Sequence, residues 1–243
     1  MKHLFILYKG MFHGFILRVY DGNSFDEKFK NYLYYSGIQK IPWISSTDYD
    51  KYYNTLANII SKHSSYRILL KLIYDYRKKK LQSVTQGFTK ILGVEGFFKD
   101  MPTVDDTIID EHVEIFRELG AIAEHHLKLL YAIKSNYSSQ KDIDGLETTN
   151  FYDIWKVLKN DVDYSVFTKP FPNTIYWNAS KHSGITKKVR SKEIEFKSSN
   201  GSDILPYPNF VSLVRELYAC VIVLIKIGLI IRFRYKIYIT MKM

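Results

Sequence analysis

The residues best suited to chemistry lie in the segment NTIYWNASKHSGI, residues 173–185. Asn178 and His182 are four residues apart, so a helix would place them on one face. Trp177 and Lys181 share another face of the same helix. His182 falls in the last turn, where the helix dipole favours a protonated imidazole. We expect His182 to act as a general acid or base and Asn178 to orient it.

Basic residues continue after this helix, at Lys187, Lys188, Arg190 and Lys192. Together with Lys181 they could hold phosphate and stabilise the charge that develops when a 2′-hydroxyl attacks a phosphodiester. The alternative is a capping histidine on a packing helix, followed by a solvated basic loop. Spacing alone favours this alternative.

Other catalytic and metal-binding patterns are missing from the sequence. It has no glycine-rich phosphate loop, no His-Glu-x-x-His and no nucleophile elbow. His112 and His126 would lie about 21 Å apart on a straight helix, so they could share a metal only if Gly120 breaks it. We interpret the histidines at 125 and 126 as a surface pair. The single cysteine, Cys220, indicates a buried thiol in a reducing compartment. We expect no metal and no cofactor.

The balance of charge favours a polyanionic partner. The 243 residues include 35 basic and 25 acidic ones, a net charge of +10. Such an excess is typical of proteins that bind RNA, DNA or anionic membranes, although it also serves solubility. The 20 tyrosines fit helix cores better than a stacking surface for bases, because most fall at helix-compatible spacing.

No stretch is long enough for a convincing membrane span. The apolar run ACVIVLIKIGLII, residues 219–231, contains a lysine and falls short of the ~20 apolar residues required. We therefore predict a buried core helix, no stable membrane insertion and a cytoplasmic location. A remaining alternative is a membrane-associated protein that uses the apolar N-terminus and residues 222–236.

Hydrophobic periodicity and capping residues predict the elements that must position these groups. A hairpin or a strand followed by a helix fits residues 1–20, and the tail at 232–243 stays unassigned. The expected helices are 25–36, 48–63, 66–80 with its four terminal cations, 107–135 capped by Asp105 or Asp106, 151–160 capped by Thr149 or Asn150, 174–183, and a last helix capped by Asn209. An Asn-Gly turn in 192–203 predicts a β-hairpin.

These elements predict a mainly α protein, a helical bundle with a short β-hairpin inserted before the last long helix. A boundary near Met101-Pro102 separates residues 1–100, a mostly helical region of unknown role, from the bundle at 101–243. The helix over 107–135 supplies the broadest apolar face of this bundle.

The C-terminal region resembles HEPN-superfamily domains, which carry an Arg-Asn-Ala-x-x-His helix, a short hairpin and a long apolar helix. Asn178, Ala179 and His182 match the helix motif, and Ile194 and Phe196 match the hairpin. The resemblance implies a bundle of four or five helices over 101–243, often dimeric. Many members are metal-independent ribonucleases of toxin–antitoxin, abortive-infection and CRISPR-linked defence, with Arg-x4-6-His from two subunits. Others bind RNA or nucleotides without cleaving them.

The sequence departs from this family at the arginine. Trp177 occupies that position, and none of the seven histidines has an arginine at the family's spacing. Tryptophan supplies no cation for a phosphate. We therefore expect an RNA-binding protein that forms homodimers in prokaryotic or phage-linked defence, and leave open a metal-independent ribonuclease activity with an altered site. The alternative is a catalytically inactive HEPN-like module for dimerisation or partner docking.

Overall fold

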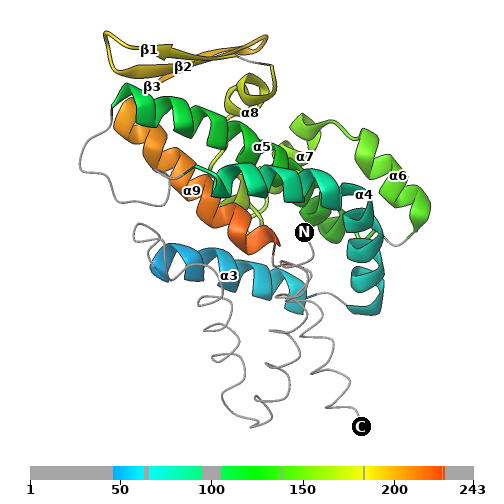
Figure 1. Cartoon of the computed structure of the whole chain (residues 1–243). Helices are drawn as coiled ribbons and strands as arrows, with labels where there is room; N and C mark the ends of the chain where they lie inside the picture. Colours follow the sequence, from blue (N-terminus) through cyan, green and yellow to red (C-terminus); the bar gives the residue numbers. More distant parts are fainter. Residues whose placement is uncertain are drawn as a thin grey trace. The chain divides into compact units, whose positions relative to one another are not determined.

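The computed structural model describes residues 46–62, 66–94, 105–137, 139–182, 184–225 and 227. The predictions for residues 1–20, for a helix over 25–36 and for the tail at 232–243 lie outside these ranges. The described residues form helices and a small antiparallel sheet (Figure 1). The prediction of a mainly α fold, with a hairpin before the last long helix, is confirmed.

Helix α5 (Asp106–Lys134) supplies the central apolar face, as its periodicity predicts. Asp105 is the N-cap, because its side chain accepts the Ile108 backbone N–H at 2.9 Å. The helix runs unbroken through Gly120, where an added Cβ would lie 3.2 Å from Ser180 Oγ. The glycine therefore permits close packing against the neighbouring segment and does not divide the helix.

Helix α9 (Tyr207–Ile225) packs against α5 and also against α3 (Ser46–Ser61). It is apolar and long enough to cross a membrane by length and composition, but most of it is buried inside the bundle. The prediction that Asn209 caps this helix is wrong, because the helix begins at Tyr207. The Tyr207 backbone N–H donates to the Lys192 carbonyl at 2.9 Å, which joins the sheet to the helix start.

Helix α4 (Tyr66–Leu92) lies along α5 and is much longer than predicted. The sequence places its end at the cations of residues 77–80, yet the helix continues for three more turns. An added Cβ at Gly87 would lie 3.0 Å from Ile122 Cδ1, so this glycine packs closely on α5. Tertiary packing therefore overrides the weak helix propensity of the glycine. Contacts group residues 42–243 into one compact unit, so α3 and α4 share it with α5 and α9.

Two short helices with side-chain caps follow α5, and a 3₁₀ turn without such a cap comes after them. Helix α6 (Gln140–Thr148) begins with a capping box formed by Ser139 and Asp142. Asn150 caps α7 (Phe151–Lys159), and a 3₁₀ turn, η2 (Ser165–Thr168), comes next. These caps satisfy backbone donors that would otherwise lack partners at the helix starts.

The antiparallel sheet has the order β1 (Ile185–Lys188), β2 (Glu193–Ser198) and β3 (Gly201–Pro206). Strands β2 and β3 form the predicted hairpin, with Ser198 paired to Gly201 at its turn. Ile194 and Phe196 point into the core, where Phe196 contacts Phe116 and Phe210 with ring centroids 5.7 and 5.8 Å away. Strand β1 is an addition, since the sequence indicates a basic loop there.

Candidate functional site

Helix α8 (Thr174–Lys181) carries the residues predicted to do chemistry. Asn173 caps it by accepting the Ile175 backbone N–H at 2.9 Å. His182 is the C-cap residue, and its backbone N–H donates to the Asn178 carbonyl at 3.0 Å. The His182 side chain is exposed and the Asn178 side chain is partly exposed.

Gly184 holds the end of α8 against the sheet. Its carbonyl accepts the Lys197 backbone N–H at 2.7 Å, and its own N–H donates to the Ala179 carbonyl at 2.9 Å. An added Cβ at Gly184 would lie only 2.0 Å from the Lys197 carbonyl oxygen. The glycine is therefore required by the close approach of β2, which the sequence cannot reveal.

Trp177, at the position of the missing arginine, has a packing role. Its ring stacks on Phe151 with centroids 4.2 Å apart and an interplanar angle of 17°. The Lys181 ammonium lies 4.8 Å from the centroid of the indole. Phe151 is fully buried, so the indole covers the start of α7 and makes no cationic site.

Lys181 is paired with a buried carboxylate. It forms an ion pair with Glu124 of α5, whose side chain is 9% exposed. Lys128, one turn further along α5, contributes a second ammonium 3.5 Å from the same carboxylate and donates to the Glu147 carbonyl at 3.0 Å. Lys181 therefore neutralises a buried charge, which competes with any role in holding phosphate.

Two of the downstream lysines are bound to the start of α5. Lys187 lies 2.5 Å from Asp110, and Lys192 lies 3.2 Å from Asp106. The hydrogen bond from Lys192, followed by one from Tyr207, holds the pKa of the Asp106 carboxyl below its usual range. Burial and then the bond to Asp106 raise the pKa of Tyr207 to about 12. These contacts join the sheet and α9 to the N-terminus of α5.

The predicted RNA-binding residues do not form one cluster. Lys188 lies 3.6 Å from Glu195, whereas Arg190 is exposed and has no ion-pair partner among the residues that the structure describes. Lys181 contacts the middle of α5, about 21 Å along the helix from the aspartate that binds Lys187. The four lysines are paired inside the molecule, so Arg190 alone of these five predicted residues has no ion-pair partner among the described residues.

Comparison with protein-family models, with curated proteins and with solved structures found no match.

No group of three or more histidine, cysteine or acidic side chains is placed to hold a metal within the described parts of the chain.

The interpretation of the histidines at 125 and 126 as a surface pair is wrong for His126, which is buried with its Nδ1 2.8 Å from the Ile122 carbonyl. Burial lowers the pKa of His125 below its usual range. Burial also lowers the pKa of His112, against the smaller opposing effect of the hydrogen bond to the Ile108 carbonyl. Burial also raises the pKa of Cys220, which fits the predicted structural thiol.

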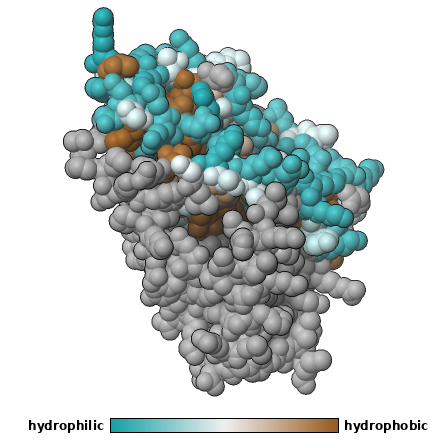
Figure 2. All heavy atoms as spheres, in the orientation of Figure 1, coloured by the Kyte–Doolittle hydropathy of each residue, from teal (hydrophilic) through white to brown (hydrophobic). Residues whose placement is uncertain are grey.

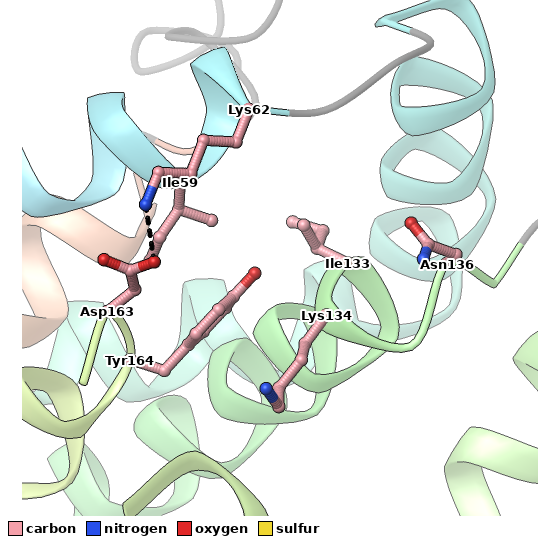
Figure 3. A pocket seen from close by; sticks show the side chains of 7 residues that line it. All are labelled: Ile59, Lys62, Ile133, Lys134, Asn136, Asp163 and Tyr164. Atoms are coloured by element: carbon pink, nitrogen blue, oxygen red, sulfur yellow. Dashed lines mark hydrogen bonds and ion pairs between the residues drawn. The ribbon is translucent and has the colours of Figure 1, made fainter. Parts of the chain in front are cut away.

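A cavity of about 340 Å³ lies between α3, the end of α5 and the turn before η2 (Figure 3). Its cations already have partners: Lys62 lies 2.6 Å from Asp163, and Lys134 is paired with Asp161. Tyr164 points into the cavity, and burial followed by these two aspartates raises its pKa to about 12. The matched charges make this cavity a poor site for a phosphate.

Helix α4 concentrates the positive charge of the described residues. It has seven basic residues and one acidic residue, whereas the other described residues have 16 basic and 19 acidic ones. The visible described surface is mainly hydrophilic, with small hydrophobic patches (Figure 2). The run YRKKK is visible in the sequence, but we interpret it there as the end of a helix. Its place in the middle of α4 is what the structure adds.

Some α4 lysines bind neighbouring helices and others do not. Lys79 lies 2.7 Å from Asp144 of α6, Lys80 lies 3.7 Å from Glu147, and Lys90 is paired with Glu118. Lys71 and Lys78 are exposed and have no ion-pair partner among the described residues. Tyr74 lies between them in sequence and is 59% exposed. The spacing of three and four residues places these three side chains on one outward face.

Proposed function

We propose that this protein binds RNA through the outward face of α4, which consists of Lys71, Tyr74 and Lys78. The observation that carries the proposal is that Lys71 and Lys78, on the most basic of the described helices, have no ion-pair partner among the described residues and flank an exposed aromatic ring. Lysines bind phosphates as point charges, and a tyrosine ring can lie against a base or a sugar. A helix face of this kind follows the nucleic-acid backbone without reading its sequence.

The proposal moves the RNA contact away from the residues that the sequence indicates. Lys181, Lys187, Lys188 and Lys192 each have an acidic partner, so phosphate would have to compete with an existing ion pair. Lys71 and Lys78 have no acidic partner to exchange in the part of the chain that the structure describes. Arg190 is also exposed, and it could add a contact near the sheet.

A fluorescence-anisotropy titration with labelled RNA at several salt concentrations tests this proposal. The double variant Lys71→Ala/Lys78→Ala should bind more weakly and lower the slope of log K against log salt by about one unit per lysine removed. The matched control is Lys79→Ala/Lys90→Ala, which removes two α4 lysines that already have acidic partners. Equal losses in the two double variants would refute a specific role for the outward face.

The alternative is an inactive module that docks on a protein partner or on a second copy. Its binding would change little with salt, because it would not depend on releasing counterions from phosphates. Absence of RNA binding by the wild-type protein would favour this alternative. The HEPN resemblance, the homodimer, the role in defence and the cytoplasmic location stay predictions.

Cleavage of RNA also stays a prediction. His182 is exposed and could reach a substrate, but Trp177 packs on Phe151 and provides no cation. Incubating total RNA with the protein in EDTA, wild type beside His182→Ala, tests the metal-independent ribonuclease. Cleavage by the wild type that is lost in His182→Ala would support the ribonuclease activity. RNA that stays intact with both proteins would refute it.

A further inference from the structure

Helix α7 presents aromatic and basic side chains on its exposed side. Tyr152, Trp155, Lys156 and Lys159 recur at i, i+3, i+4 and i+7, which places them on one face. The rings of Tyr152 and Trp155 are stacked, with centroids 6.4 Å apart and planes at 29°. The Lys159 ammonium lies 4.3 Å from the centroid of the indole. The opposite side of α7 is buried in the core.

Two hydrogen bonds hold this arrangement in place. The Trp155 indole Nε1–H donates to the Phe171 carbonyl at 2.9 Å, and the Lys159 ammonium donates to the Pro172 carbonyl at 2.8 Å. Both acceptors belong to the segment just before α8, so the indole and the ammonium are anchored to the bundle. A ligand that binds there would meet a preorganised surface and would lose less conformational entropy on binding.

The Tyr152 ring and Lys156 are left for a ligand. Tyr152 is 45% exposed although its ring already rests on Trp155. Lys156 is exposed and has no ion-pair partner in the described part of the chain. A flat aromatic surface with a free cation one turn away matches a nucleobase and its phosphate.

We infer that this face of α7 is a stacking site for an unpaired nucleobase of RNA, an inference that rests on RNA being the partner proposed for α4. The base would lie on Tyr152, and Lys156 would contact the adjacent phosphate. A base inside a duplex has both faces covered by its neighbours, so the site would select single-stranded RNA. The two lysines on this face, Lys156 and Lys159, favour a polyanion over an apolar protein surface.

The test compares fluorescein-labelled oligouridylate with an RNA duplex of equal length in anisotropy titrations. Tyr152→Ala should weaken oligouridylate binding roughly tenfold, as expected for the loss of one stacked base. Tyr152→Phe keeps the ring and should bind like the wild type. Val162→Ala, at another exposed apolar residue (90% exposed), is the matched control and should also bind like the wild type. Duplex affinity should be the same for all four proteins.

The stacking site would be overturned if Tyr152→Ala binds oligouridylate as tightly as the wild type does. The α4 proposal would still hold in that case, provided that the lysine variants of α4 weaken binding. An equal loss of duplex and single-strand affinity in Tyr152→Ala would also overturn it. If the wild-type protein binds neither RNA, both proposals fail. Circular dichroism melts of each variant show whether a loss of binding comes from unfolding.

Discussion

The substitution Gly184→Ala tests how the end of α8 is held against the sheet. The new Cβ would lie 2.0 Å from the Lys197 carbonyl oxygen and 3.1 Å from Ala179 Cα. An ordinary contact begins near 3.4 Å, so β2 would have to retreat by about 1.4 Å. The obstacle is backbone on both sides, so no side-chain rotation can relieve it.

The cost follows from two contributions. Overpacking of a tight site costs about 1–3 kcal/mol, and the retreat would break the 2.7 Å bond from the Lys197 N–H to the Gly184 carbonyl, worth about 0.5–1.5 kcal/mol. The free energy of unfolding should therefore fall by about 2–4 kcal/mol. For a chain of this size that corresponds to a Tm lower by roughly 4–16 °C.

Differential scanning calorimetry measures the change, with Gly145→Ala as the matched control. An added Cβ at Gly145, an exposed residue inside α6, would meet nothing within 4 Å. Alanine is the better helix former, so this variant should gain about 0.5–1 kcal/mol. A Gly184→Ala protein whose Tm equals that of the wild type would refute the assigned contact between α8 and β2.

Two further predictions concern buried charge. Glu124→Ala should lower the free energy of unfolding, measured by urea denaturation, by about 3 kcal/mol, because Lys128 would keep a buried charge without its carboxylate. The control is Lys90→Ala, which breaks an exposed ion pair and should leave the urea midpoint unchanged. Equal effects of the two substitutions would contradict this reasoning. Burial lowers the pKa of His112 below its unfolded value near 6.5, so the unfolded state binds more protons below that pH, and Tm should fall as pH drops from 7 to 5.5. His112→Gln should flatten that dependence, and an unchanged slope would assign it to other groups.

The sequence by itself determined most of the helical structure and the hairpin. Caps are local, so the residues that follow them narrow the cap of α5 to Asp105 or Asp106 and that of α7 to Thr149 or Asn150, and the structure shows Asp105 and Asn150. The alternation of Ile194 and Phe196 before the Asn-Gly pair at 200–201 is equally local, because side chains on a strand alternate between two faces. The broad apolar faces of α5 and α9 follow from helical periodicity alone.

Only the tertiary structure decided which charges are free and where the helices end. Lys181 and Lys187 look available in the sequence, but their acidic partners on α5 are 57 and 77 residues away. Gly87 reads as a helix breaker until its contact with Ile122 is known. Because of that packing α4 is longer than predicted, and Lys78 lies on an outward face inside the helix and not at its end. Ion pairing and packing depend on contacts between distant segments, and residue spacing within one segment does not contain them.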